Sequence, residues 1–188
     1  MDFSPPVKRT LLHRRRILCE GYEREDGLWD IEAQLLDTRS FELALPLGGR
    51  LAANEPLHQM GLRITVDRDS IIREVEPLTA HGPSSECRDI SDTYRQLLGL
   101  RIAAGFSAAV KRLFGGRLGC THLTDLLGPM ATTAMQTLWG AQIRNAARGD
   151  ETPIRVGDPK ALINSCHAFR SDGEIARVHW PDSFTGAK

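Results

Sequence analysis

Two segments of the chain alternate between apolar and mostly polar residues with a period of two, in residues 28–37 and again in residues 60–67. This alternation is typical of a strand with one face in the core and the other in water. Residues 14–24 and 71–78 predict two further strands, and the EDG tripeptide at 25–27 marks a turn. The apolar positions expected to point inward are Trp29, Ile31, Ala33, Leu35, Met60, Leu62, Ile64 and Val66.

The period changes in the second half of the chain, where apolar residues recur at the spacing of an amphipathic helix. Residues 90–98 and 102–113 predict two helices that end at glycines, and Thr121 is the expected N-cap of a third. Gly128-Pro129 should kink or break this third helix early. Its expected buried residues are Leu123, Leu126, Leu127, Met130, Ala134 and Leu138.

The order of elements predicts an α+β fold, in which an antiparallel sheet meander is covered on one face by helices. We expect residues 1–150 to form a single domain and residues 151–188 to be a C-terminal extension that packs on it. The polar, turn-rich stretch at 146–160 would be the loop between them. Cys166-His167 lies in the extension, and its role stays open at this point.

Composition limits the classes of function. The chain has 188 residues, with 24 basic and 24 acidic side chains that cancel, so an electrostatic interaction with nucleic acid is not expected. No run approaches the roughly 18 apolar residues of a membrane-spanning helix, and the N-terminus lacks the apolar region of a secretory signal. Four widely spaced cysteines without a CxxC motif favour reduced thiols in the cytoplasm.

The run HRRR at residues 13–16 is a local exception to the balanced charge. On a strand, Arg14 and Arg16 share one face, and His13 and Arg15 share the other. A solvated edge strand and a site for an anion or a partner are both consistent with this pattern.

Four side chains with metal-binding chemistry stand at the ends of predicted elements. His58 precedes the third strand, Cys87 precedes the first helix, and Cys120 and His122 flank the start of the third helix. Element ends can meet in a layered fold, and imidazole and thiolate ligands suit zinc, iron or copper. The alternative is a purely structural role, in which the cysteines are small buried apolar residues and the histidines are satisfied by hydrogen bonds.

Cys120 also suggests nucleophilic chemistry. A thiol just before a helix is close to unpaired N–H groups and the positive end of the helix dipole, which favours the thiolate. His122 could then be a second metal ligand or a general base.

Several motifs carry a resemblance to known families. The segments GYEREDGLWDIEAQLLDT, EPLHQMGLRITVD, GGRLGCTHLTDLLGPMATTAMQT and CHAFRSDG together resemble an uncharacterised bacterial domain family, which implies no activity. The stretch from LRITVD to GPSSEC and the later GCTHL motif are similar to NifU-type iron–sulfur cluster scaffolds. That resemblance implies that Cys87 corresponds to the middle cysteine of the scaffold, that Cys120 corresponds to its last, and that His58 lies near its first ligand loop.

The chain departs from the scaffold pattern at two places. The loop around His58 has no cysteine, and Gly119 stands where the scaffold has a histidine before its last cysteine. A mononuclear zinc or iron ion held by His58, Cys87, Cys120 and His122 therefore fits the sequence better than an iron–sulfur cluster.

Three functional hypotheses follow. The first is a cytoplasmic protein that binds zinc or iron, or serves as an iron–sulfur scaffold. The second is a small enzyme, either metal-dependent or with Cys120 as nucleophile, for which aromatic-compound metabolism is one setting. The third is a metal-free binding or regulatory module. The expected partners are a metal ion and, in some of these hypotheses, a small molecule or a partner protein, with neither nucleic acid nor membrane among them.

Overall fold

The computed structural model describes residues 4–150, 152–154 and 162–186. The elements along the chain are β1 (His13–Glu23), β2 (Trp29–Arg39), β3 (Leu43–Ala44), β4 (Arg50–Leu51), β5 (Pro56–Val66), β6 (Ile72–His81), α1 (Glu86–Asp89), the 3-10 helix η1 (Ile90–Leu97), α2 (Phe106–Phe114), the 3-10 helix η2 (Gly116–Leu118), α3 (Thr121–Ala146), α4 (Glu174–His179) and the 3-10 helix η4 (Pro181–Ser183).

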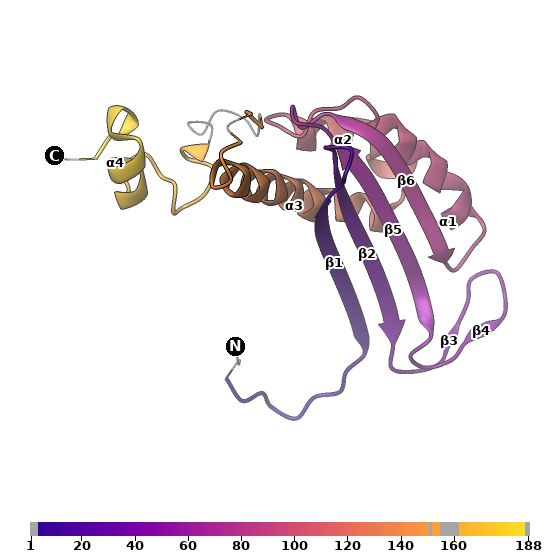
Figure 1. Ribbon diagram of the computed structural model, residues 1–188. Helices are drawn as coiled ribbons and strands as arrows, with labels where there is room; N and C mark the ends of the chain where they lie inside the picture. Colours follow the sequence, from indigo (N-terminus) through magenta and orange to yellow (C-terminus); the bar gives the residue numbers. More distant parts are fainter. Residues whose placement is uncertain (1–3, 151, 155–161, 187–188) are drawn as a thin grey trace.

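The main sheet has the strand order β1-β2-β5-β6, and each neighbouring pair is antiparallel. The strands β3 and β4 form a separate two-stranded ribbon in the connection from β2 to β5. Gly27 takes a φ of 81° in the turn between β1 and β2, a conformation that glycine adopts without steric cost. The predicted antiparallel meander and the α+β class are confirmed (Figure 1).

One face of the sheet carries the core. The eight apolar residues expected to point inward from β2 and β5 are all at most 2% exposed. The long helix α3 packs across β1, β2 and β5, while η1 covers β6 (Figure 1). Each large apolar side chain removed from water stabilises the fold by about 2 kcal/mol, so this face supplies the main driving force for folding.

The first two predicted helices differ from the observed ones. Residues 90–97 form a 3-10 helix after the single turn of α1, with Tyr94 and Leu97 buried and Leu98 58% exposed. The second helix begins at Phe106, since Gly105 has a φ of 91° and the buried Ile102 lies in the preceding loop. The apolar spacing therefore identified most of the buried residues, but it was wrong for Leu98, for the helix type and for the helix start.

The third helix is longer and more continuous than expected. Its N-cap is Cys120, and Thr121 is the first helical residue. The helix continues through Pro129, so the predicted break is wrong. All six residues expected to be buried are at most 1% exposed, and their packing on the sheet offsets the one hydrogen bond that proline removes. Within the described ranges, no helix is long and apolar enough to cross a membrane.

The third strand of the main sheet starts before the position that alternation predicts. β5 begins at Pro56, so His58 lies inside the strand rather than ahead of it. The cause is the length of β2, which continues to Arg39 and provides cross-strand partners for the first residues of β5. This extension brings His58 into register with β2.

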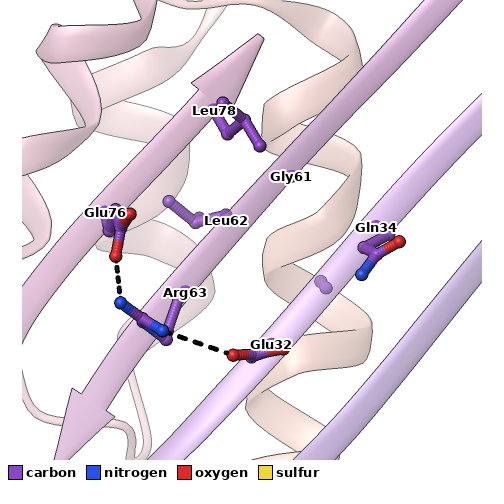
Figure 2. Close-up of a pocket in the computed structure, with 8 residues that line it drawn as sticks. Glu32, Gln34, Gly61, Leu62, Arg63, Glu76 and Leu78 are labelled. Carbon is purple, nitrogen blue, oxygen red and sulfur yellow. Dashed lines mark hydrogen bonds and ion pairs between the residues drawn. The ribbon is translucent and has the colours of Figure 1, made fainter. Parts of the chain in front are cut away.

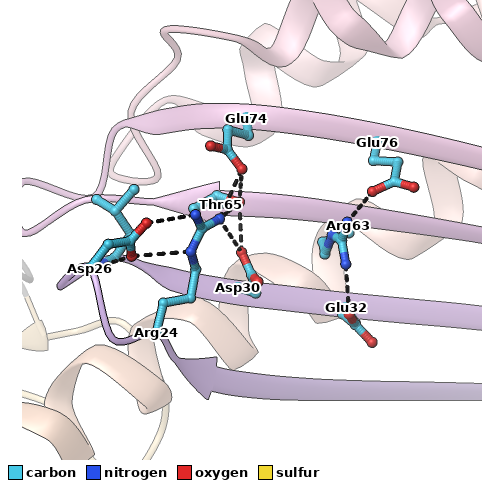
Figure 3. Close-up of polar contacts among 9 residues, drawn as sticks. Arg24, Asp26, Asp30, Glu32, Arg63, Thr65, Glu74 and Glu76 are labelled. Atoms are coloured by element: carbon cyan, nitrogen blue, oxygen red, sulfur yellow. Dashed lines mark hydrogen bonds and ion pairs between the residues drawn. The ribbon is translucent and has the colours of Figure 1, made fainter.

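In the part of the chain that the structure describes, no helix lies against the opposite face of the sheet, and this face is largely polar. Two arginines each bridge acidic side chains from neighbouring strands or turns (Figure 3), and such exposed pairs add little stability. A shallow depression lies over Gly61, between Leu78 and Gln34 (Figure 2), and no predicted site residue lines it. The charged groups are Arg24 with Asp26, Asp30 and Glu74, and Arg63 with Glu32 and Glu76.

The described part of the C-terminal segment forms local structure around α4 and η4, with Phe169 and Trp180 in edge-to-face contact. Cys166 is exposed. The predicted linker overlaps the end of α3, and its residues 151 and 155–160 lie outside the described residues. The division into a domain of residues 1–150 and an extension that packs on it stays a prediction.

A close approach of α3 to β1 gives a test of this packing. A Cβ atom on Gly21 would lie 1.8 Å from Oγ1 of Thr137 in α3, so Gly21→Ala should destabilise the fold by about 1–3 kcal/mol, measured by urea unfolding. Gly128→Ala is the control, since its Cβ meets nothing within 4 Å and should stabilise the helix by about 0.5–1 kcal/mol. If Thr137→Ala did not restore stability to Gly21→Ala, the proposed contact would be wrong.

Candidate metal centre

Three polar side chains form one row across the helix-covered face of the sheet. Arg15 of β1 is the cross-strand partner of Asp37 of β2, and Asp37 is the partner of His58 of β5. Asp37 is the next inward position after Leu35, because side chains alternate along a strand. The strand register therefore places a cation, a carboxylate and an imidazole side by side at one end of the core.

The first turns of α3 lie over this row. The ring of His122 stacks on the ring of His58, with 3.6 Å between centroids and 28° between planes. One turn later in the helix, Asp125 accepts a hydrogen bond of 2.9 Å from Nη1 of Arg15. The start of α3 and the end of β2 thus contribute side chains to the same cluster.

Tyr94 fixes the position of the helix start. Its side chain is fully buried, and its hydroxyl oxygen accepts the backbone N–H of Cys120 at 2.9 Å. The same hydroxyl lies 2.7 Å from the carbonyl oxygen of Cys120 and 2.6 Å from Oγ1 of Thr124. Gly119 permits this approach, since a Cβ there would lie 3.0 Å from the tyrosine oxygen. The 3-10 helix and α3 are therefore joined at Cys120, two residues before His122.

The carboxylate of Asp37 is the centre of the cluster and is 1% exposed. Nε of Arg15 donates to Oδ1 and Nη2 donates to Oδ2, each at 2.8 Å. Nε2 of His13 lies 3.4 Å from Oδ1. Burial by itself would raise the pKa of Asp37, but the hydrogen bonds and charge of Arg15 outweigh burial and lower it. Asp37 is therefore an ionised carboxylate inside the fold.

Two imidazoles face the same oxygen of this carboxylate. Nδ1 of His58 lies 3.2 Å from Oδ2 of Asp37, and Nε2 of His122 lies 3.5 Å from it. Burial lowers the pKa of both histidines, and positive charge lowers it further, from His122 in the case of His58 and from Arg15 in the case of His122. At neutral pH both rings are therefore neutral, the form in which histidine binds metals.

The three donor atoms have the spacing of ligands around one ion. The ligand atoms of Asp37, His58 and His122 all lie within 4.8 Å of one another. With zinc–ligand bonds of about 2.0–2.1 Å, neighbouring ligands on a tetrahedral ion are about 3.3–3.4 Å apart. The distances of 3.2 Å and 3.5 Å from Asp37 to the two histidines match this separation.

The four residues predicted from the sequence are divided by the structure. His58 and His122 belong to the group of three, whereas Cys87 and Cys120 do not. Sγ of Cys120 lies 3.8 Å from Nδ1 of His122. The other ring nitrogen of His122, Nε2, faces Asp37. Cys87 is in α1 and lies against Gly82, with its sulfur 3.7 Å from Oγ of Ser84.

Sequence reasoning missed Asp37 and Arg15. Asp37 continues the inward series of β2. A charged residue at an inward position was the feature of the sequence that could have identified it. Arg15 and His13 share a face as expected, but their partner is the buried Asp37 of the same chain. The run HRRR does lie on an exposed edge strand, as the first alternative expected, and on its inward side His13 and Arg15 also contact this buried carboxylate.

The fold and this cluster define a class: an α+β protein with a candidate histidine–aspartate metal centre. The family model described as protein of unknown function DUF2889 matches residues 13–136, and the chain belongs to this family. The match includes the whole main sheet and the start of α3, and it confirms the expected uncharacterised family. Neither the curated proteins nor the solved structures contain a match, so the similarity to NifU-type scaffolds gains no support.

The lowered histidine pKa values predict an acid-sensitive fold. The unfolded chain takes up a proton at each histidine near the ordinary pKa of 6.5, whereas folded His58 and His122 take it up only at lower pH. The free energy of unfolding of the metal-free protein should therefore fall as the pH drops below 6.5 and be constant just above it. Urea unfolding in a chelator from about pH 5 to pH 8 measures this dependence.

The double variant His58→Gln/His122→Gln should lose the fall in stability below pH 6.5. His81→Gln, which changes an exposed histidine outside the cluster, should retain it. The contribution of Asp37 lies in a separate window, because its ionised form stabilises the fold until the pH falls below its ordinary value of 3.8. An unchanged profile in the double variant would contradict the assignment.

Proposed function

We propose that this protein binds one transition-metal ion, zinc or ferrous iron, through Asp37, His58 and His122. The observation that carries the proposal is the convergence of one carboxylate oxygen and two imidazole nitrogens from β2, β5 and α3. Two neutral imidazoles and one carboxylate suit both metals. Three protein ligands leave at least one coordination position open, the arrangement found in catalytic rather than structural metal sites.

Arg15 can stay in place when an ion binds. Each carboxylate oxygen has two lone pairs, and Arg15 uses one on each oxygen of Asp37. The second lone pair of Oδ2 faces the two histidines, and a metal there would take the place of the 3.2 Å hydrogen-bond contact with Nδ1 of His58. Arg15 would then act as an outer hydrogen-bond donor that orients the ligating carboxylate, as outer-shell partners do in known metal sites. Its positive charge is balanced by Asp125.

A single ion is a better match for these residues than an iron–sulfur cluster. Clusters are held mainly by cysteine thiolates, and the group of three contains none. Cys120 stands outside the group, and its described contact with the group is to Nδ1 of His122, the nitrogen that faces away from Asp37. Its sulfur can accept the Nδ1–H of His122, which would leave Nε2 free for the metal. The four described cysteines are all free thiols, which supports a cytoplasmic location as part of the proposal.

Calorimetric titration of chelator-treated protein with zinc tests the site. Wild type should bind one equivalent, and Asp37→Asn, His58→Gln and His122→Gln should each weaken binding at least about a hundredfold, since even outer-shell changes cost up to that factor. His81→Gln should bind as wild type does. Thermal unfolding of each variant without metal shows whether it is folded. The proposal fails if wild type takes up neither zinc nor iron, or if folded His58→Gln binds as tightly as wild type.

A cysteine-nucleophile enzyme is a second candidate, because His122 lies between a thiol and a carboxylate. Its Nδ1 is 3.8 Å from Sγ of Cys120, and its Nε2 is 3.5 Å from Oδ2 of Asp37. In such an enzyme, Cys120 would be the nucleophile, His122 the base and Asp37 the carboxylate that orients the base. We rank it second because the thiol is directed toward the core, 3.9 Å from the sulfur of Met60, which is 2% exposed.

Alkylation by iodoacetamide at pH 7, mapped by mass spectrometry, tests the second candidate. If Cys120 is an activated nucleophile, it should react at least about tenfold faster than the exposed Cys166, and His122→Gln should remove the difference. Slower reaction of Cys120 than of Cys166 in the folded protein would exclude this role.

A further inference from the structure

A second set of metal-binding atoms lies next to the first and does not involve Asp37. Sγ of Cys120 is 3.9 Å from Sδ of Met60 and 3.8 Å from Nδ1 of His122. Met60 is an inward residue of β5, two positions after His58, and is 2% exposed. Cys120 is partly buried against the same core. A thiol, a thioether and an imidazole nitrogen thus meet at the edge of the core.

The two distances match those of ligands on a three-coordinate ion. With metal–sulfur bonds of about 2.3 Å, two sulfur ligands at trigonal angles are about 4.0 Å apart. A sulfur and a nitrogen at about 2.3 Å and 2.0 Å are then about 3.7 Å apart. The observed separations of 3.9 Å and 3.8 Å require little rearrangement of these side chains.

Ligand softness and charge select the ion. Thiolate and thioether sulfurs prefer Cu(I) among the common biological metals. A monovalent ion with one thiolate, one neutral thioether and one neutral imidazole forms a group without net charge, which a mostly buried position tolerates. A divalent ion on the same ligands would leave an uncompensated positive charge beside the core, at a large desolvation cost.

We propose that Cys120, Met60 and Nδ1 of His122 form a second site, which binds Cu(I). Binding replaces the S–H bond of Cys120 with a copper–sulfur bond, and the proton leaves to solvent without any change in oxidation state. The site shares only His122 with the zinc or iron site and uses its other ring nitrogen. The second proposal therefore does not depend on the first.

The shared ring makes the two sites antagonistic. A neutral imidazole has one N–H and one nitrogen lone pair, so it coordinates through one nitrogen at a time. Copper at Nδ1 puts the hydrogen on Nε2, which then faces Oδ2 of Asp37 as a donor. Zinc at Nε2 puts the hydrogen on Nδ1, which then faces the sulfur of Cys120. Zinc loading should therefore weaken the binding of Cu(I).

Competition with a chromogenic Cu(I) chelator under anaerobic conditions tests the site on the full chain. Wild type should keep one equivalent of Cu(I) from the chelator, whereas Cys120→Ser should lose this equivalent to it. Met60→Leu, which conserves volume and apolarity, should weaken binding by about tenfold or more because it removes one of three ligands. Cys19→Ser is the matched control, since Cys19 is also a partly buried free thiol and its described hydrogen-bond partner is Thr133.

The outcomes separate the two metal proposals. Asp37→Asn should lose zinc and keep Cu(I), whereas Cys120→Ser should lose Cu(I) and keep zinc. X-ray absorption of the copper-loaded protein should show two sulfurs and one nitrogen around the ion. The copper site is disproved if folded Cys120→Ser withholds as much Cu(I) as wild type, or if Met60→Leu leaves the affinity unchanged. Neither result bears on the site of Asp37, His58 and His122, which the zinc titration tests independently.

Discussion

A buried negative charge organises one end of this protein. Asp37 occupies a position that the strand directs into the core, and an unpaired carboxylate at this depth would cost several kcal/mol. The edge strand supplies Arg15, whose two hydrogen bonds keep the acid ionised. The next strand and the start of α3 bring His58 and His122 to the remaining side of the same carboxylate. The sheet register places Arg15 and His58 beside this carboxylate, and the start of α3 places His122 there.

The helix-covered sheet follows from the sequence because period-two alternation and burial on one face are local properties of each strand. His58 and His122 were both candidates from the sequence because each lies near the start of its strand or helix, although His58 is inside β5 rather than ahead of it. Asp37 is harder to identify, because a charged residue after Leu35 resembles the end of a strand. Its role emerges only when the partner strands are in register. Cys87 was predicted as a ligand but is not in the group of three. Its position near a helix start does not determine the direction in which its thiol points.

His122 connects two kinds of coordination chemistry within a few ångströms. On one side of its ring are a carboxylate and a second imidazole, which suit a divalent ion of intermediate hardness. On the other side are a thiol and a thioether, which suit a soft monovalent ion. The tautomer of one side chain therefore decides which ligand set is complete. In a family without a known activity, this residue connects every functional hypothesis that the geometry supports.

Pro129 has a consequence for the residues that precede it. It has no N–H, so the carbonyl of Asp125 lacks the hydrogen bond that the next turn of a helix normally supplies. The segment with His122 is thus attached less firmly to the rest of α3 than an uninterrupted helix would hold it. Two further anchors of this turn are the hydroxyl of Tyr94 and the ion pair of Asp125 with Arg15. If a bound ion drew the imidazole of His122 closer, this turn would have one backbone hydrogen bond fewer to resist a small adjustment, while Leu123, Leu126 and Leu127 keep it packed in the core.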